Sequence, residues 1–393
     1  MSRRYDVVVA GGGIHGAGMA QAAAASGHSV LLLEQEAIAA GSSSRSSKLI
    51  HGGLRYLESG QLRLVRESLH ERALMLKLAP ELVRLQKFFI PVYDHSRRKP
   101  WQLRIGLSLY ALLAGLDGAA RFGTVPLSGW AQLDGLDTHG LRQVFYYHDA
   151  QTDDALLTAA VMRSAQSLGA ELALPARFTG ATLAGDEVQV RYLHNGSQLE
   201  CTARVLVNAA GPWADALARC ITPAISVPAL ELVQGTHLVL DGPPQQGVYY
   251  VESPRDGRAI FVMPWRNQLL VGTTEVRFHG DPAAVTPGPH EIHYLLSVLR
   301  HYFPKYRDAA AAELRGAFAG LRVLPAGGGH AFHRSRETLL VPDRGARPRV
   351  LSIYGGKLTT WRAVAARAMA LLAPSLPQRR VLARTDELEL RPS

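Results

Sequence analysis

The feature that most constrains the fold is the stretch from Asp6 to Glu34, which reads as strand, glycine turn, helix and second strand in one unbroken order. The β-branched run from Asp6 to Ala10 has the length of a buried strand. Gly11, Gly13 and Gly16 follow at G-x-G-x-x-G spacing, which permits a tight turn, close approach of a pyrophosphate to the backbone, and close packing of helix on strand. This arrangement predicts a Rossmann-like dinucleotide-binding unit.

The residues after the glycines complete that unit. Ile14–Ser26 is Ala-rich and suits a helix whose N-terminus faces the pyrophosphate, and Gly27 ends it. Ser29–Leu33 forms the second strand, and Glu34 follows about 20 residues past the glycines, where a carboxylate binds ribose hydroxyls. The alternative is a Gly-rich turn without a ligand, but the complete order of elements favours the dinucleotide.

Length and charge limit the remaining choices. The chain has 393 residues, more than one compact core usually holds, so we expect two domains. Its formal net charge of +10 suits an anionic ligand, an anionic membrane surface or a nucleic acid. Nucleic acid is disfavoured because no Lys/Arg-rich arm, zinc-ligand spacing or aromatic RNA-binding signature is visible. The charge also has a plainer explanation, namely that arginine is simply frequent in this sequence.

Two further features bear on where the protein works. Cys201 and Cys220 are the only cysteines, which argues against a disulfide framework and for a reducing compartment. The first expected strand begins near residue 5, which leaves no room for a signal peptide, and no apolar run is long enough to span a membrane. We therefore expect a cytoplasmic protein.

A Ser-rich segment follows the second strand. Gly41–Glu58 reads G-S-S-S-R-S-S-K-L-I-H-G-G-L-R-Y-L-E. Hydroxyls in such a loop can cap a helix or bind a phosphate chain, and the Gly-Gly pair permits close backbone approach. His51, Arg55 and Tyr56 lie within six positions of one another, and this group is too polar for an ordinary core segment.

Two later segments repeat the order of strand, turn and helix. Arg204–Ala214 reads R-V-L-V-N-A-A-G-P-W-A, in which Pro212 suits the first turn of a helix. Val350–Arg362 reads V-L-S-I-Y-G-G-K-L-T-T-W-R, with a helix beginning near Leu358. The amides and positive dipole of that helix could meet a charged ring edge, so we expect both segments to face the dinucleotide.

The segment between them predicts a different architecture. Val233–Thr274 reads as consecutive strands without intervening helices, which favours an antiparallel sheet in a second domain. His237 and Arg258 stand beside its apolar runs, although a lone His there is more often structural than catalytic. Arg322 interrupts the strand-like run at 317–324. Because charged groups are rarely buried without a partner, we expect Arg322 to face a ligand or an acid.

A basic cluster precedes a short apolar helix. Arg97, Arg98 and Lys99 are followed by Trp101–Leu116, which is too short and too interrupted to span a bilayer but could lie on an anionic one. The alternative, which we favour from the sequence alone, is an ordinary buried helix beneath a solvated basic turn.

Three aspartates raise the question of a metal. Asp149, Asp153 and Asp154 lie close together in sequence, but hard-metal sites need more oxygen ligands with supporting spacing. Helix capping by Thr152 or Asp153 is the better interpretation, and we predict no metal site.

Seven segments together resemble the FAD-dependent glycerol-3-phosphate dehydrogenases, within the larger D-amino-acid-oxidase-like flavoprotein superfamily. The resemblance extends to about residue 370, and its second and last segments are the specific ones. In chain order they are G-G-G-I-H-G-A-G, S-S-K-L-I-H-G-G-L-R-Y-L-E, N-A-A-G-P-W, F-V-M-P-W, V-G-T-T-E, A-G-L-R-V-L and Y-G-G-K-L-T-T-W-R.

The resemblance implies an α/β protein with a Rossmann-like FAD-binding domain and an α+β second domain, whose mostly antiparallel sheet covers the flavin ring. The FAD-binding domain would comprise residues 1–75, 150–215 and 320–375. The substrate or cap domain would comprise residues 76–149 and 216–319, and residues 376–393 would form a C-terminal tail.

The resemblance also implies an oxidoreductase that converts sn-glycerol 3-phosphate to dihydroxyacetone phosphate by hydride transfer to flavin N5. Electrons would pass to a quinone or another acceptor. Removal of the hydroxyl proton needs a base with a pKa near 7, which suits histidine, and guanidinium groups suit the phosphate. The candidate catalytic residues are His51, His237 and Lys357, and the candidate substrate-binding residues are Arg55, Tyr56, Arg258 and Arg322. The residues expected to contact FAD are Gly11, Gly13, Ile14, Gly16, Glu34, Ser42, Ser43, Ser47, Leu49, Gly52, Gly211, Gly356, Lys357, Leu358 and Thr359.

Some positions depart from the family pattern. His15 stands where Asn is usual, Glu275 where Asp is usual, Leu156 where Arg is common and Val323 where Pro is usual. Most bacterial members also continue into a helical C-terminal domain that has no counterpart in this sequence.

These departures leave three alternatives open: a different phosphorylated polyol or hydroxy acid as substrate, a flavin oxidase, or a flavin-binding protein without turnover. Attachment to the inner face of the cytoplasmic membrane and a homodimer also stay open, and the sequence does not decide which histidine is the base.

Overall fold

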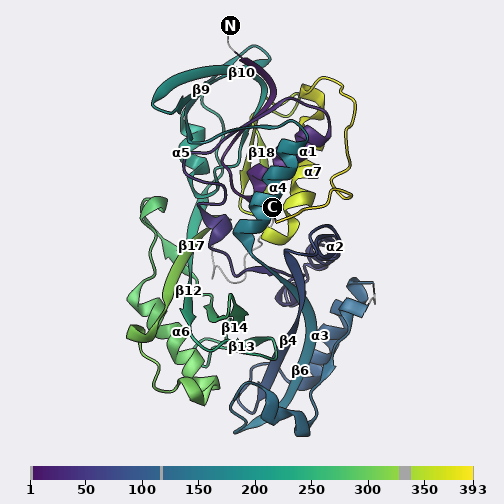
Figure 1. Ribbon diagram of the computed structural model, residues 1–393, viewed down its shortest axis with the longest axis vertical. Coiled ribbons are helices and arrows are strands. Elements are labelled where there is room, and N and C mark those ends of the chain that lie inside the picture. Colours follow the sequence, from purple (N-terminus) through teal and green to yellow (C-terminus); the bar gives the residue numbers. More distant parts are fainter. Residues whose placement is uncertain (1–2, 116–117, 327–337, 393) are drawn as a thin grey trace.

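The computed structural model describes residues 3–115, 118–326 and 338–392. Two large β-sheets, each with helices packed on it, form two lobes along the long axis of the molecule (Figure 1). The upper lobe in this view holds both the N-terminal residues 3–10 and the segment 338–392, so segments far apart in sequence build it together.

The first sheet is mixed. Its strands lie in the order β11-β8-β9-β10-β1-β2-β7, while β19 pairs with β10 and with β18. The strands are β1 (Arg3–Ala10), β2 (Val30–Leu33), β7 (Glu171–Ala173), β8 (Ala176–Ala184), β9 (Glu187–His194), β10 (Ser197–Asn208), β11 (Ile221–Thr222), β18 (Leu339–Pro342) and β19 (Val350–Tyr354).

Four parallel strands of this sheet determine where a ligand can bind. β1 pairs in parallel with β2 and with β10, and β10 pairs in parallel with β19. Their carboxyl ends therefore meet at one edge, where Ala10, Leu33, Asn208 and Tyr354 are the last residues. In open α/β sheets ligands bind in the crevice outside the carboxyl ends, so this edge is the expected position of the site.

Helices cover the first sheet. α1 (Ile14–Ala25) contacts α4 (Asp154–Ser167) and α7 (Trp361–Leu372) on one face, and the short α5 (Ala214–Arg219) lies on the other side of the sheet (Figure 1). α1 consists mainly of Ala and Gly and is buried on nearly all sides. Its small side chains permit this: a Cβ atom at Gly18 would lie 2.6 Å from the Trp361 ring of α7.

The second sheet is mostly antiparallel, as expected. Its order is β16-β12-β15-β14-β13-β4-β6-β3, with β17 paired to β12 and β5 to β6, and the pair of β4 with β13 is parallel. The strands are β3 (Leu49–Ile50), β4 (Val83–Tyr93), β5 (Gly123–Thr124), β6 (Leu141–Thr152), β12 (Leu230–Leu240), β13 (Val248–Glu252), β14 (Ala259–Trp265), β15 (Gln268–Gly272), β16 (Val276–Phe278) and β17 (Gly316–Pro325).

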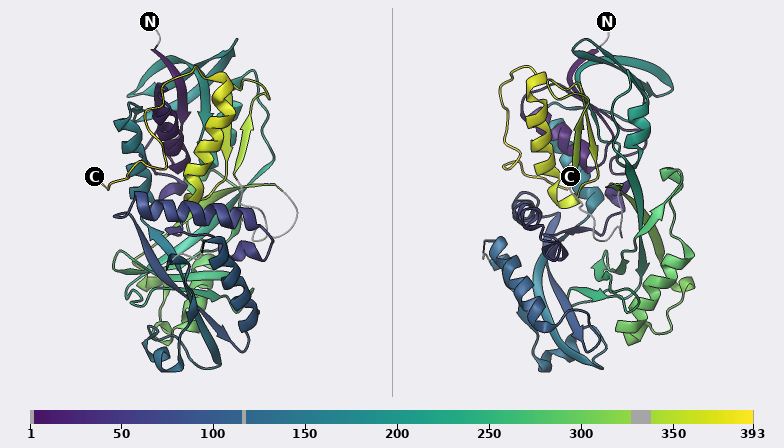
Figure 2. Two further views of the ribbon diagram at one scale, coloured as in Figure 1. Left: turned by 90° about the vertical axis from the view of Figure 1, so that its right-hand side faces the viewer. Right: turned by 180° about the vertical axis from the view of Figure 1, so that it is seen from behind.

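Both faces of this sheet are packed, which follows from the period of two along a strand. In β4, Phe88 joins a cluster with Leu107 of α3 (Pro100–Leu113), while its neighbour Phe89 joins a second cluster with Leu295 of α6 (Pro289–Tyr302). α3 and α6 therefore cover opposite faces of the second sheet, and α2 (Leu62–Leu78) lies between the two lobes (Figure 2).

Most expected elements are present with shifted ends. Between the Ser-rich segment and the basic cluster the structure has α2, which ends at Leu78, and β4, which begins at Val83. An Asn195–Gly196 turn, a pair of residues typical of tight hairpins, joins β9 to β10. Sheet membership places residues 49–50 and 316–325 in the second sheet, whereas the boundaries of the two domains stay a prediction.

The apolar helix expected after the basic cluster is α3, and it is not buried on all sides. Trp101, Ile105 and Leu112 are 63%, 61% and 61% exposed and lie on one helical face. The interpretation of this segment as an ordinary buried helix is therefore wrong for that face. None of the helices among the described residues is both long and apolar enough to cross a membrane.

Candidate active site

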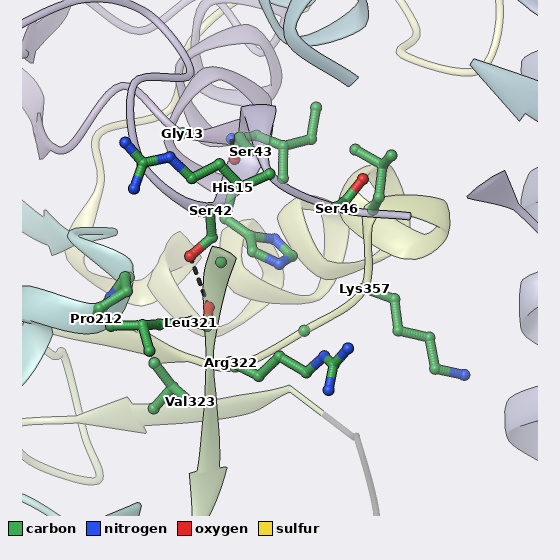
Figure 3. A pocket seen from close by; sticks show the side chains of 18 of the residues that line it. Gly13, His15, Ser42, Ser43, Ser46, Pro212, Leu321, Arg322, Val323 and Lys357 are labelled. Atoms are coloured by element: carbon green, nitrogen blue, oxygen red, sulfur yellow. Dashed lines mark hydrogen bonds between the residues drawn. The ribbon is translucent and has the colours of Figure 1, made fainter. Parts of the chain in front are cut away.

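A cleft of about 660 Å³ lies at the carboxyl edge of the first sheet and extends to the second sheet. The turns that follow β1, β2, β10 and β19 form one side of it, and residues of β12 and β17 contribute to the other. Figure 3 shows side chains from these separate segments, among them His15, Ser42, Arg322 and Lys357, pointing into the same space.

The glycine turn after β1 is shaped by contacts that exclude side chains. Gly11 has φ +110°, and a Cβ atom on it would lie 2.6 Å from the Ala209 carbonyl oxygen. A Cβ atom on Gly16 would lie 1.8 Å from the Gly11 carbonyl oxygen. The first glycine thus permits the turn, and Gly16 permits α1 to pack against it.

Glu34 lies directly after β2 and holds the glycine turn from the other side. Its carboxylate accepts hydrogen bonds from the backbone N–H of Gly12 at 2.7 Å and of Glu36 at 2.8 Å. The acid that the sequence assigns to ribose recognition therefore also fixes the backbone that would approach the pyrophosphate.

The Ser-rich segment lines the cleft and makes hydrogen bonds to three different elements. Ser43 Oγ accepts from the Ile14 N–H at 2.9 Å, and Ser42 Oγ donates to the Leu321 carbonyl at 2.6 Å (Figure 3). Ser47 Oγ lies 3.0 Å from His237 Nε2. This loop therefore ties the first sheet to the second.

A buried ion pair anchors the same loop. Lys48 Nζ lies 2.6 Å from Asp154 Oδ1, and the two side chains are 5% and 0% exposed. Asp154 Oδ2 also accepts hydrogen bonds from the backbone and hydroxyl of Ser46, at 3.0 and 2.7 Å. Because breaking one partner of a buried pair is costly, this contact fixes the loop position firmly.

The cleft has the chemistry that an adenine dinucleotide needs. α1 begins at the cleft with Gly13 as N-cap, which has no side chain of its own, and Ser43 Oγ accepts from the first N–H of the helix. His15 lines the cleft, and its buried Nδ1 has no hydrogen-bond partner among the described residues. A helix N-terminus, a glycine turn that a side chain would fill, and an acid after the second strand together fit FAD.

Cations gather at the opposite end of the cleft. Lys357 Nζ lies 3.9 Å from the centroid of the Tyr56 ring, and the Arg55 guanidinium lies 5.0 Å from the same centroid. Arg55 Nη2 also donates to the Tyr56 hydroxyl at 3.4 Å. Tyr56 is buried, so its ring holds both cations in position through cation–π contacts.

Arg322 and Arg258 share one carboxylate. Glu275, whose side chain is 2% exposed, lies 3.4 Å from Arg322 Nη1 and 3.1 Å from Arg258 Nη1. Arg322 Nη2 also donates to Thr273 Oγ1 at 3.2 Å. The expectation that Arg322 would face a ligand or an acid is met by Glu275, which the sequence singled out only as a departure from the family pattern.

The two candidate bases occupy different environments. His237 lies in β12, is 1% exposed and stacks on Phe318 at a centroid distance of 4.9 Å. Burial, with Arg322 and Lys48 nearby, holds the pKa of His237 well below 6.5. His51 is half-buried in the loop after β3, and the Thr359 hydroxyl lies 3.1 Å from its backbone nitrogen and 3.3 Å from its carbonyl oxygen.

The cleft brings together most residues singled out in the sequence. The residues that line it are Gly11, Gly13, Ile14, Glu34, Ser42, Ser43, Ser47, Leu49, His51, Arg55, Tyr56, Gly211, His237, Arg322, Gly356, Lys357, Leu358 and Thr359.

Three other candidates lie elsewhere. Gly16 supports the turn from within α1. Gly52 packs closely against Tyr110, since a Cβ atom on it would lie 2.4 Å from the Tyr110 hydroxyl. Arg258 lines a second cavity.

Other features of the site gave no sequence signal. Tyr250 and Phe261 line the cleft, but they lie within apolar strand runs and look like core residues in the sequence. The Lys48–Asp154 pair joins positions 106 apart in sequence.

The three aspartates are used structurally. Asp153 caps α4 as predicted, since its side chain accepts from the Leu156 N–H at 3.1 Å. Asp149 pairs with buried Arg72 at 2.7 Å, and Asp154 pairs with Lys48. Among residues 3–115, 118–326 and 338–392, no group of three His, Cys, Asp or Glu side chains is arranged to hold a metal ion.

Comparison with known proteins agrees with this geometry. Residues 6–366 match the family model described as FAD dependent oxidoreductase. The chain is 36% identical over 381 residues to a glycerol-3-phosphate dehydrogenase of Pseudomonas tolaasii, covering 96% of this chain and 73% of that protein. It is 34% identical over 381 residues to a D-erythritol 1-phosphate dehydrogenase of Brucella abortus, covering 95% and 74%. A solved structure of the glycerol-3-phosphate dehydrogenase from Bacillus halodurans with FAD superimposes with a TM-score of 0.74 at 26% identity, covering 98% and 68%.

Proposed function

The chain belongs to the family of FAD-dependent oxidoreductases that includes the glycerol-3-phosphate dehydrogenases, and on that premise we propose that it oxidises sn-glycerol 3-phosphate to dihydroxyacetone phosphate. FAD is its cofactor, and when bound it supplies the acceptor for the hydride that leaves the substrate. The electrons then pass to a quinone or another acceptor.

The observation that most supports this substrate is the convergence of cations at one end of the cleft. Arg55, Arg322 and Lys357 all line it, and Figure 3 shows the Arg322 and Lys357 side chains extending to the same side of the His15 ring. A phosphate monoester is a dianion near neutral pH, and planar guanidinium groups bind it bidentately. Glu275 offsets only part of this positive charge, so the site suits an anion.

We assign the proton-accepting role to His51. A general base works best when its pKa lies near the operating pH. The pKa of His237 lies well below 6.5, and its Nε2 is engaged by Ser47, so it suits a role that positions the Ser47 loop. His51 lines the cleft and is half-buried, and Thr359 holds its backbone.

The first test is anaerobic mixing of the purified holoenzyme with sn-glycerol 3-phosphate while flavin absorbance is followed. Rapid bleaching is expected. If dithionite bleaches the flavin and sn-glycerol 3-phosphate does not, the substrate assignment fails. His51→Gln should slow the bleaching by roughly 100-fold or more and remove the acidic limb of its pH profile, because general-base catalysis contributes about 10²–10⁴-fold. His237→Gln should retain that limb, and loss of the limb there instead would reassign the base.

A related polyol phosphate is the second candidate substrate. The similarity to the Brucella abortus D-erythritol 1-phosphate dehydrogenase supports it. Glu275 also supports it, because this residue has a longer side chain than the Asp usual in the family and holds both Arg258 and Arg322. Comparing second-order rate constants for flavin bleaching by glycerol and tetritol phosphates decides between them. A larger constant for a four-carbon substrate would replace the first assignment.

We further propose that α3 attaches the protein to an anionic membrane surface at the inner face of the cytoplasmic membrane. Its exposed face carries Trp101, Ile105 and Leu112, and Arg97 and Lys99 lie just before the helix. An aromatic and aliphatic face beside basic residues is the pattern of interfacial helices. A membrane quinone would then be the accessible acceptor.

Flotation with vesicles of anionic lipid at low salt tests this attachment. The wild-type protein should float, and Ile105→Glu should not. Val381→Glu is the matched control, because Val381 is 62% exposed in the C-terminal segment, and it should float like wild type. Equal flotation of both variants, or none of the wild type, would contradict the proposal.

A further inference from the structure

A second cavity of about 720 Å³ adjoins the cleft. Its walls come from α3 with the basic turn before it, the loop after β3, and the connection from β13 to β14. Leu54, Arg55 and Tyr250 line both the cavity and the cleft. These three side chains therefore separate the two spaces, and the Arg55 guanidinium is common to both.

The position of this cavity matters once the cofactor is considered. The residues that fit FAD line the cleft from Glu34, through the glycine turn, to Thr359. A dinucleotide held by these residues would fill the part of the cleft that the first sheet borders. The second cavity reaches the same Arg55 from the side of α3 and the second sheet, so it offers a small molecule a separate approach to the cations of the cleft.

The charges of the cavity suit an anion in transit. Four arginines line it, namely Arg55, Arg97, Arg98 and Arg258, against three carboxylates. Arg258 is itself held by Glu275, the same carboxylate that holds Arg322 of the cleft. Guanidinium groups thus continue from the cavity into the reaction end of the cleft, and a cation-lined passage concentrates anions.

The three acids are each paired with an arginine of the cavity: Asp256 lies 3.9 Å from Arg258 Nε, and Glu58 and Glu252 both contact Arg98. Arg98 donates to Glu58 Oε2 at 2.9 Å and also contacts Glu252, so it joins the loop after β3 to the end of β13. The side chains of Arg98 and Glu252 are 18% and 16% exposed. This bridge keeps the two walls of the cavity together.

We propose that the second cavity is the passage through which the phosphorylated polyol enters and the product leaves, with Arg55 at its inner end. The inference rests on the proposed function, since it takes the same substrate class. It assigns a role to a space that the cofactor and the reacting groups do not use.

Gly106 offers a way to block this passage. It lies in α3 and lines the cavity, and a Cβ atom on it would meet nothing within 4 Å. A graded series of Gly106→Ala, Gly106→Leu and Gly106→Trp in the holoenzyme therefore fills the cavity stepwise from a helix position that accepts a side chain. Gly345→Trp is the control, because Gly345 also has open space around it and lines neither cavity.

The measurement is anaerobic flavin bleaching over a range of sn-glycerol 3-phosphate concentrations, followed by reoxidation with a soluble quinone. The second-order rate constant of bleaching should fall by about tenfold or more in Gly106→Trp, less in Gly106→Leu and not in Gly106→Ala, since blocked access slows association. The limiting rate at saturation, flavin content and reoxidation should be unchanged.

The alternative outcomes are distinct. An unchanged second-order constant in both Gly106→Leu and Gly106→Trp overturns the passage while leaving the proposed function intact. Slowed reoxidation with normal bleaching also overturns it and reassigns the cavity to the acceptor. If no phosphorylated polyol bleaches the wild-type flavin, the proposed function fails and the passage fails with it.

Discussion

Arg322 donates to the buried carboxylate of Glu275 across 3.4 Å, and this contact joins strand β17 to the residues that follow β15. Glu275 also holds Arg258, so one acid restrains two arginines that border different cavities. The first prediction concerns removal of that charge.

Glu275→Gln should destabilise the protein by about 2 kcal/mol, because a buried acid that serves two partly exposed arginines is worth less than a fully buried pair but more than a surface one. The KM for the substrate should rise as well, because Arg322 loses its anchor. Thermal unfolding and steady-state kinetics check this. Glu389→Gln, at the exposed pair with Arg391, is the control and should change neither quantity.

Arg322→Ala tests the phosphate-binding group directly. It should lower kcat/KM by about 100-fold, mainly through KM, because a charge-assisted contact to the phosphate is lost. Flavin content should be unchanged. Arg315→Ala lies near the start of the same strand, at an exposed pair with Asp241, and should behave like wild type. An Arg322→Ala variant with an ordinary KM would remove this arginine from the substrate site.

Gly16→Ala should abolish FAD retention and lower the free energy of unfolding by about 1–3 kcal/mol, the usual cost of forcing extra atoms into a packed site. The added Cβ would lie 1.8 Å from the Gly11 carbonyl oxygen, so the turn must open. Flavin absorbance after gel filtration and urea unfolding measure the two effects. Gly345→Ala should leave both unchanged, and a yellow, stable Gly16→Ala protein would show that the turn tolerates a side chain.

The fourth prediction is a pH dependence. Burial, with Arg367 nearby, lowers the pKa of His15 to about 4, so the unfolded chain binds this proton more readily than the native protein. The stability linked to His15 is therefore fully present above about pH 6.5 and is lost as the pH falls from 6.5 towards 4.

Urea unfolding of the two apoproteins measures the free energy of unfolding at each pH. The difference in that free energy between wild type and His15→Asn should change by about 2 kcal/mol over that range. The expected change is smaller than the full difference between the two pKa values would give, because the cleft admits solvent. Other groups titrate alike in both proteins and cancel. Parallel curves for the two proteins would show that His15 does not titrate in this way.

The nucleotide half of the site follows from local sequence because its chemistry is contiguous. Gly11, Gly13 and Glu34 lie within one βαβ unit, and the parallel register brings the turn before Gly211 and the turn at Gly356 to the same edge. Backbone conformation and strand direction therefore suffice to predict which residues meet.

The substrate half depends on long-range register, which local sequence does not encode. The sequence predicts that Arg322 faces a ligand or an acid, but it does not identify Glu275, which follows another strand 47 positions away. Tyr250 and Phe261 read as core residues, and only the position of β13 and β14 exposes them to the cleft. The sequence does not predict the exposed face of α3 for the same reason. Periodicity predicts a helix, but it does not predict which of its faces pack against the rest of the protein.

The first sheet has a consequence for how the protein is made. β1 pairs with β10, and β10 pairs with β19. The sheet is therefore complete only after residues 350–354 have been synthesised, long after residues 3–10. At a translation rate of about 5–20 residues per second, roughly 20–70 s separate their synthesis. β10 is itself made only at positions 197–208, and β9 already pairs with its first half, so residues 206–208 lack their β19 partner for roughly 7–28 s at that rate. Non-local pairing of this kind folds slowly. FAD capture is therefore a late event in the life of the nascent chain.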